Sequence, residues 1–281
     1  MAGVSTKEIK SRIRSMQATR QITKAMEMVA ASKLRRAQMQ VLASRPYFET
    51  LYEVIHSIAD TNRELSSPYL KARAGDKMLY VVIAGDRGLA GGYNSNLLKL
   101  VMSEIQGRDA TVLPIGKKTG EFFQSRKIPC LTEYSNEAAA MSMSDCFAVA
   151  KQLCKLFKDG MYDGVYVTYT NFVSVLSQTP GTLQLLPLIR QESKREKKAT
   201  DVVYEPDSEQ VFETIIPEYV GGVLYGALCE SRASEQAARR TAMDSATQNA
   251  DEMIADLSLK FNRARQASIT QEITEIVAGS Q

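Results

Sequence analysis

The sequence predicts an α/β protein in which two long terminal helices form an antiparallel coiled coil around a central, mostly parallel α/β domain. Two observations carry this prediction. The first is an extended helical pattern at each end of the chain, over residues 5–58 and 222–277. The second is the alternation of strand and helix patterns over residues 77–190, which is typical of a doubly wound sheet.

The N-terminal helix is expected over residues 1–60, with a break at Pro46 because proline removes a helical hydrogen bond. Apolar residues recur in it at steps of three and four, which predicts a narrow seam packed against one partner helix. These residues are Ile9, Ile13, Met16, Ile22, Met26 and Val29. Residues 1–46 carry ten Lys and Arg against two Glu. This basic stripe indicates an acidic partner, which can be a protein surface or nucleic acid.

The central domain, over residues 77–190, is expected to be Rossmann-like. Residues 78–84 (MLYVVIA) form a continuous apolar run, the pattern of a strand buried on both faces. Further strands are expected at 110–115, 128–131 and 163–169, with one or two more in 173–188, and helices at 94–106, 117–126 and 143–157. Ser142 or Ser144 is the expected N-cap of the last helix. Residues 190–208 are charged and predict an exposed loop.

The C-terminal helix is expected over residues 209–281, restarting after Pro217. Its apolar positions also follow steps of three and four: Leu224, Leu228, Met253, Leu257, Phe261, Ile269, Ile273, Ile276 and Val277. Seams of this kind at both ends of one chain can bury each other. This is why an antiparallel coiled coil is favoured over two independent helices.

Catalytic, cofactor and metal sites are not indicated. Residues 85–94 (GDRGLAGGYN) follow the first strand, where a dinucleotide fold holds a pyrophosphate, but the spacing is not GxGxxG and Asp86 would repel phosphate. A structural glycine turn is the favoured interpretation. The lone histidine, His56, belongs to no sequence motif with a nucleophile or with further metal ligands. The four cysteines show no CxxC pair. We expect reduced, structural thiols.

The lengths of the apolar runs indicate where the chain is located. None approaches the length of a membrane span, and residues 1–4 lack the apolar core of a signal peptide. We expect a chain kept in the cytoplasm that reaches a membrane only through a partner.

Two polar clusters, Arg239 with Arg240 and residues 263–266 with Thr270, are typical of a solvated coiled-coil face.

Three stretches resemble the γ subunit family of the F-type ATP synthase, the central shaft of its catalytic head. They are residues 13–38 (IRSMQATRQITKAMEMVAASKLRRAQ), residues 85–96 (GDRGLAGGYNSN) and residues 233–280, which begin ASEQAARRTAMDSATQNADEM. The resemblance covers both ends and the centre of the chain. It implies a non-catalytic rotor subunit that occupies the cavity of an α3β3 hexamer, binds the ε subunit and the c-ring, and couples proton flow to ATP synthesis.

The resemblance also implies roles for individual residues. Contacts that couple the shaft to the β subunits are carried over to Met26, Arg239, Arg265, Gln266 and Thr270. The tip, turning in an apolar collar, would be Ile269, Ile273, Ile276 and Val277. The basic N-terminal helix would face acidic loops of the β subunits. The implied location is the cytoplasmic side of a bacterial cell membrane, as a peripheral subunit.

Two other function classes remain open at this point. One is a small-molecule enzyme with a Rossmann-like core and helical dimerisation arms, which would bind a nucleotide tightly. The other is a coiled-coil scaffold for nucleic acid, whose affinity would fall steeply with salt. Residues 187–207 lack the cysteine pair that makes chloroplast members of the family redox-switchable, so thiol regulation is not expected. The chain ends slightly short of many relatives, which predicts a weaker tip contact.

Overall fold

A computed structural model describes the chain except residues 1–5, 62–66, 133–135, 189–204, 206 and 280–281. The structure divides into two units. The paired-helix unit comprises Met1–Ala31 and Arg239–Gln281, and the sheet unit comprises Ser32–Ala238. Helices α1 (Thr6–Thr61) and α5 (Ser208–Gly279) each contribute to both units. The loop expected at 190–208 lies largely outside the described residues.

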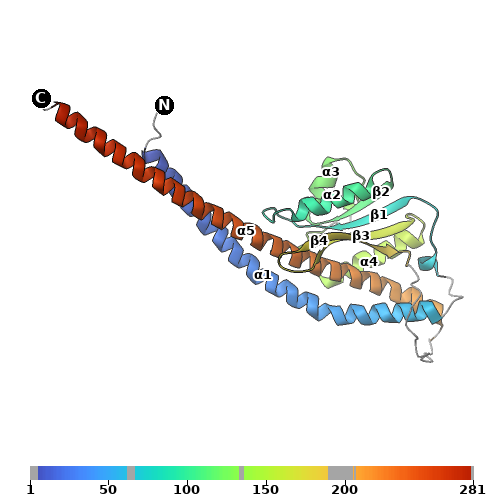
Figure 1. Ribbon diagram of the computed structural model, residues 1–281. Helices are drawn as coiled ribbons and strands as arrows, with labels where there is room; N and C mark the ends of the chain where they lie inside the picture. The colour runs from blue at the N-terminus through green and yellow to red at the C-terminus, as the bar shows by residue number, and fades with distance from the viewer. Residues whose placement is uncertain (1–5, 62–66, 133–135, 189–204, 206, 280–281) are drawn as a thin grey trace. The chain divides into compact units, whose positions relative to one another are not determined.

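The sheet unit is built on four strands in the order β2-β1-β3-β4 (Figure 1). Their bounds are β1 (Lys77–Ile83), β2 (Asp109–Ile115), β3 (Gly164–Phe172) and β4 (Gln178–Leu186). Strand β1 runs parallel to β2 and β3, and β4 pairs antiparallel with β3. The predicted fold class, a mostly parallel α/β sheet with long helices at both ends of the chain, is therefore confirmed.

Helices cover both faces of this sheet (Figure 1). Alternate residues of β1 point to opposite faces, so Tyr80 and Val82 pack in a core with α2 (Tyr93–Ile105) and α3 (Lys117–Ser125). Leu79, Val81 and Ile83 pack on the other face. That second core is formed with α4 (Met143–Lys158), with α5 residues between Phe212 and Leu228, and with Ile55 and Ile58 of α1. Burial on both faces explains why the β1 sequence is apolar without alternation.

Both predicted helix breaks at proline are wrong. Helix α1 continues through Pro46 and α5 continues through Pro217. A proline inside a helix costs about 3 kcal/mol, so neighbouring packing must offset this cost. Around Pro217 the offset is visible, because Ile216 and Val220 are completely buried in the core of the sheet unit. Local propensity is here overridden by tertiary contacts.

The shorter elements follow their predictions with one correction. Residues 128–131 do not form a strand: Cys130 makes an isolated bridge with Val112, and Pro129 has no N–H to extend the ladder. Residues 173–188, expected to hold one or two strands, hold one, β4, which is the antiparallel strand of the mostly parallel sheet. The predicted N-cap of α4 is confirmed, because the Ser142 hydroxyl accepts from the Asp145 N–H, and the Asp145 carboxylate accepts from the Ser142 N–H.

The four cysteines are free, and three of them are buried. Burial raises the pKa of Cys146 and of Cys154 to about 12, and it also raises the pKa of Cys229. Because the thiolate is the reactive form, these three should not react in the folded chain at pH 8. We expect a thiol reagent to label the half-exposed Cys130 slowly and all four cysteines in denaturant. Rapid labelling of more than one thiol in the native chain would contradict this packing.

Candidate functional site

The paired-helix unit holds every residue that the sequence singled out for function. Its two helix segments run antiparallel, because Arg20 pairs with Asp251 while Thr23 contacts Thr247. On α1, buried or half-buried residues recur seven apart at Ile9, Met16, Thr23 and Ala30, with half-buried Ile13 between the first two. On α5, the buried or half-buried residues at heptad spacing are Met243, Thr247, Ala250, Ile254, Leu257, Phe261 and Ala264. Spacing of this kind on both helices is the geometry of two helices packed along a single seam, which on α1 is interrupted at the exposed Arg20.

This seam corrects part of the predicted one. Ile9, Ile13 and Met16 lie in it as expected, and so do Leu257 and Phe261. Ile22, Val29 and Met253, however, are 61%, 55% and 56% exposed. Each was assigned to the seam because it is apolar, whereas the constant heptad places Thr23 and Ala30 there, one position beyond Ile22 and Val29. These three apolar side chains, two on α1 and one on α5, therefore lie exposed outside the seam.

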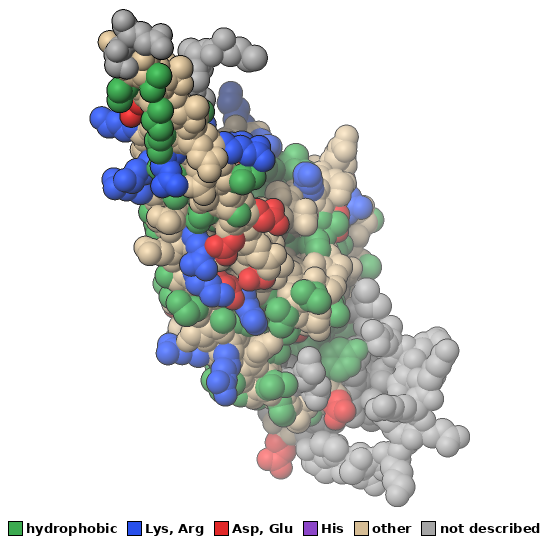
Figure 2. All heavy atoms as spheres, turned by 60° about the vertical axis from the view of Figure 1, so that its left-hand side comes forward, with side chains coloured by type: hydrophobic (Ala, Val, Ile, Leu, Met, Phe, Trp, Pro, Cys, Tyr) green, Lys and Arg blue, Asp and Glu red, His purple; other side chains and the backbone are tan. Residues whose placement is uncertain are grey.

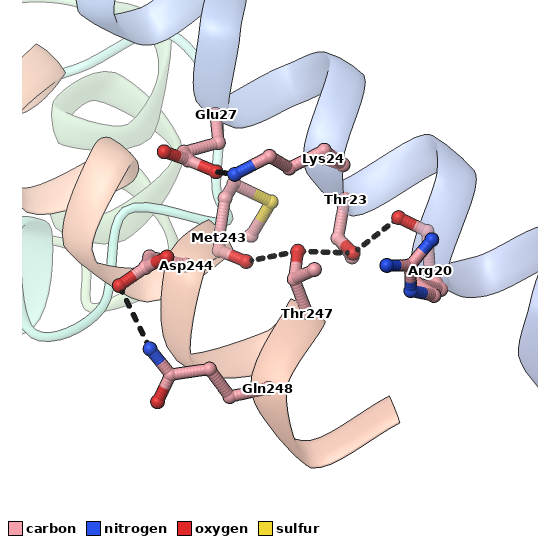
Figure 3. Close-up of polar contacts among 8 residues, drawn as sticks. All are labelled: Arg20, Thr23, Lys24, Glu27, Met243, Asp244, Thr247 and Gln248. Atoms are coloured by element: carbon pink, nitrogen blue, oxygen red, sulfur yellow. Dashed lines mark hydrogen bonds and ion pairs between the residues drawn. The ribbon is translucent and has the colours of Figure 1, made fainter. Parts of the chain in front are cut away.

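A polar layer crosses the seam where apolar residues were expected (Figure 3). The Thr247 hydroxyl donates to Thr23 Oγ1 at 2.8 Å, and the Thr23 hydroxyl donates to the Arg20 carbonyl at 3.1 Å. Thr247 Oγ1 also lies 2.8 Å from the Met243 carbonyl. At the surface of the layer, Arg20 Nε pairs with Asp251. Directional contacts of this kind fix one register for the two helices, as a polar residue does in other helix seams.

Residues 24 and 27 of α1 bracket Met26 with opposite charges. Lys24 Nζ lies 2.7 Å from Glu27 Oε2, and this hydrogen bond, with the charge of Glu27, raises the pKa of Lys24 above its ordinary value. Asp244 across the seam acts in the same direction. Lys24 therefore stays protonated throughout the physiological range, and the surface around Met26 keeps its fixed charges.

The polar layer gives a double-substitution prediction. We expect Thr23→Val and Thr247→Val each to destabilise the helix pair by about 1 kcal/mol, since each leaves a buried hydroxyl without one of its partners. The double variant should be close to neutral, because it replaces both hydroxyls with methyl groups of the same shape. Hydrogen exchange of the amides of residues 243–250 measures the effect. Additive losses in the double variant would show that the hydroxyls do not interact.

The coupling residues carried over from the resemblance lie on the surface of this unit. Met26 and Arg239 are half-buried, and Arg265, Gln266 and Thr270 are exposed. The Thr270 hydroxyl donates to the Gln266 carbonyl one turn earlier, at 2.9 Å. The last three residues share a short stretch of α5, while Met26 lies on α1. These five side chains are therefore spread along the unit and do not converge on one pocket.

The end of α5 is apolar and uncovered. Ile269, Ile273, Ile276 and Val277 are between 48% and 71% exposed. Figure 2 shows hydrophobic side chains in a row toward this end, with Lys and Arg side chains below them. Burying such residues is favourable by about 25 cal/mol per Å² of apolar surface, so an exposed cluster at a helix end indicates a surface that another molecule covers.

The turn at residues 85–94, in the sheet unit, is held by its own side chains. The Asp86 carboxylate accepts hydrogen bonds from three backbone N–H groups, those of Lys117, Ala138 and Ala139, at 2.8 to 3.0 Å. Asn94 Oδ1 accepts from the Gly85 N–H at 2.9 Å. Asp86 therefore has a structural task, as the favoured interpretation of this turn requires.

The sequence did not indicate the polar residues that pair across the seam of the paired-helix unit. Thr23, Thr247 and Asp251 carry no motif, although a strict heptad count from Ile9 would have placed Thr23 in the seam. Within the described residues, no three His, Cys, Asp or Glu side chains gather as metal ligands. The side chain of His56 is not among those described.

Comparison with known proteins gives matches over the whole chain. A family model described as ATP synthase matches residues 5–281. The ATP synthase gamma chain of Ruminococcus albus is 45% identical over 279 residues, covering 98% of this chain and 97% of that protein. The ATP synthase gamma chain of Alkaliphilus metalliredigens is 42% identical over 285 residues, covering 99% of both.

Solved structures show the same fold. A chain from the central stalk and c-ring structure of the Tetrahymena thermophila mitochondrial ATP synthase has a TM-score of 0.59 at 26% identity, covering 80% of this chain and 99% of that one. A chain from a Euglena gracilis mitochondrial ATP synthase structure has a TM-score of 0.71 at 19% identity, covering 98% of this chain and 93% of that one. With full-length matches at 42% and 45% identity, the chain belongs to the ATP synthase gamma chain family.

Proposed function

We propose that this chain is the central rotor subunit of a bacterial F-type ATP synthase. It would turn inside an α3β3 hexamer and couple proton-driven rotation of a c-ring to ATP synthesis at the β subunits. The observation that carries the proposal is the match to gamma chains along the entire length of both proteins. The structural relatives come from mitochondrial ATP synthase structures that contain the central stalk, the F1 part and the c-ring.

The surface of the paired-helix unit suits a rotor without a catalytic role of its own. The exposed apolar side chains of Ile22, Val29 and Met253 and the apolar end of α5 would face the hexamer cavity. Nonspecific contacts there would permit the rotor to turn against the cavity wall. The basic residues of α1 would face acidic loops of the β subunits. Met26, Arg239, Arg265, Gln266 and Thr270 would be the coupling contacts, and Ile269, Ile273, Ile276 and Val277 the bearing at the tip.

Partners and location follow from the same proposal. The sheet unit would contact the ε subunit and the c-ring, and the complex would hold the chain at the cytoplasmic face of the cell membrane. No described helix of this chain is both long enough and apolar enough to cross a bilayer. Association with the membrane would therefore run through partner subunits, with a coiled coil of the two helix ends as the shaft.

The proposal is tested by reconstitution. Purified α and β subunits of a bacterial ATP synthase are mixed with this chain, and Mg-ATP hydrolysis is measured with and without it. We expect a stable complex whose turnover depends on the added chain. A chain that neither associates with α and β nor changes their hydrolysis rate would contradict the proposal. An unrelated coiled-coil protein of similar charge serves as the control.

Two free energies indicate how torque would pass from the rotor to the β subunits. One proton crossing 100 mV releases about 2.3 kcal/mol, whereas an exposed ion pair contributes about 0 to 1 kcal/mol. No single exposed bridge can therefore transmit the work of several protons. The shape of the rotor must open and close the β subunits sterically, with the named contacts adjusting efficiency.

This distribution predicts a mild phenotype for two coupling residues. We expect the double variant Arg265→Ala with Gln266→Ala to assemble and rotate, with ATP-driven proton pumping reduced by less than about tenfold, the equivalent of 1.4 kcal/mol. Pumping into vesicles and hydrolysis are measured on the same complex. Complete loss of rotation in an intact complex would show that torque passes through these two side chains.

A further inference from the structure

The α/β sheet has a topological switch point at the carboxyl ends of β1 and β3. From β1 the chain passes to β2 on one side, and β3 then joins β1 on the other side, giving the order β2-β1-β3-β4. In open α/β sheets the crevice at such a point is where ligands bind. In this chain the crevice is occupied by polar residues of helix α5.

Ser231 enters the crevice next to the end of β1. Its hydroxyl donates to the Ile83 carbonyl at 3.1 Å and lies 2.6 Å from the Tyr93 hydroxyl, so Tyr93 donates to it. Both side chains are buried. Tyr93 is the first residue of α2 and ends the glycine turn of residues 85–94. The position that faces a ligand in other folds of this class therefore faces α5.

Arg232 binds the loop that joins α3 to α4. Its Nε and Nη2 donate to the Ala138 carbonyl at 2.8 and 2.5 Å, and Nη2 also donates to the Met141 carbonyl at 2.5 Å. The N–H of the same Ala138 donates to Asp86 in the glycine turn. One short loop is thus held from both sides, by α5 and by the turn.

Ser234 and Glu230 complete the contact at the end of β3. The buried Ser234 hydroxyl donates to the Thr170 carbonyl at 3.0 Å, and Glu230 Oε2 accepts from the Phe172 N–H at 3.4 Å. Residues 230–234 of α5 therefore bind the carboxyl ends of β1 and β3 and the loop between α3 and α4. Hydrogen bonds weaken steeply with misalignment, so this set resists rotation of α5 about its own axis.

We propose that Ser231 and Arg232, with Tyr93 and Ser234, form a torque joint that fixes α5 rotationally to the α/β sheet. The inference rests on the proposed rotor function and adds to it a role for the sheet unit. The crevice where related folds bind a ligand here holds helix α5, which would be part of the rotor shaft. Ser231 and Arg232 are positioning residues, since they act through the helix and touch no substrate. Apolar packing alone is not directional and would permit α5 to rotate about its own axis. The hydrogen bonds of these residues are directional and hold the rotational angle of α5 relative to the sheet.

The test measures angular stiffness in the assembled complex. A label is attached through a cysteine introduced at Met161, a 56% exposed residue of the sheet unit, and its angle is followed while the complex is stalled without ATP. The test variant is Ser231→Ala with Arg232→Met. The matched control is Ser125→Ala with Arg126→Met, because this adjacent Ser–Arg pair contacts Phe122 of its own helix region, through the Phe122 carbonyl and, for Arg126, the Phe122 ring.

We expect the variance of the label's angle to rise at least about twofold in the test variant, since most of the directional ties are gone, and to stay at the parent value in the control. Equal variance in the test variant and the parent would overturn the proposal. A purely stabilising role would lower the melting temperature without changing this variance in the folded complex.

Hydrogen exchange on the isolated full-length chain tests the joint independently of rotation. In the test variant the amides of residues 230–235 and 137–141 should exchange faster, while those of β1 and β2 keep their rates. Unchanged exchange at 137–141 would overturn the joint. If the parent complex fails to rotate under ATP but the exchange result holds, the rotor function is contradicted and the joint stands.

Discussion

Replacing Gly116 with alanine is expected to destabilise the sheet unit by at least about 3 kcal/mol, through backbone strain and a backbone clash. Gly116 links β2 to α3 with a φ of 101°, which side chains disfavour. A Cβ at this position would lie 2.2 Å from the Ala84 carbonyl oxygen. That oxygen belongs to the chain just after β1, so it cannot move aside without breaking the packing of the central strand.

The control for this substitution is Gly120→Ala in α3, where a Cβ would meet nothing within 4 Å. We expect this change to stabilise the chain by roughly 0.5 to 1 kcal/mol, because alanine favours helix over glycine. Urea unfolding followed by circular dichroism measures both variants. A Gly116→Ala chain as stable as the parent would mean that β1 and the start of α3 are not packed as described.

Replacing Asp86 with alanine is expected to cost about 3 kcal/mol. The carboxylate satisfies three N–H groups, at Lys117, Ala138 and Ala139, and hydrogen bonds to a charged acceptor contribute more than neutral ones. The loop that Arg232 binds from the other side would lose its second attachment. Loss of this one side chain should therefore loosen both the glycine turn and the α5 contact.

A graded series separates charge from geometry at this position. Asp86→Asn keeps one acceptor oxygen and should lose about 1 kcal/mol, whereas Asp109→Ala, at the exposed first residue of β2, should change stability by less than about 0.5 kcal/mol. Unfolding by urea gives all three values. Equal losses for Asp86→Ala and Asp109→Ala would show that the three backbone contacts do not stabilise the folded chain.

Local patterns predicted most elements of this fold, but not the absence of a strand at residues 128–131. The apolar run of β1, the strand and helix alternation, and the Ser142 cap each depend on residues close in sequence. The prolines misled because the effect of Pro217 depends on the burial of Ile216 and Val220, which distant segments provide. Helix α1 continues through Pro46 as well, although Leu42 and Tyr47 on either side of this proline are exposed, so burial does not explain this second case.

The functional surfaces were predictable only in part. The coupling roles that we propose for Met26, Arg265 and Gln266 rest on a resemblance, whereas the apolar pattern alone placed Ile22, Val29 and Met253 in the helix seam, where the structure does not place them. The joint between α5 and the sheet could not be predicted from sequence, because the bond from Ser231 to Ile83 joins residues far apart in the chain. Polar residues that pair across such separations leave no periodic signal.

If this chain is the rotor, it turns inside the hexamer while ATP is consumed. Rotation can be followed with a label on the sheet unit, at the Met161→Cys position, in immobilised α3β3 complexes supplied with Mg-ATP. We expect rotation in one direction, with three pauses per turn, one for each β subunit. Steady ATP hydrolysis with the label stationary would contradict it.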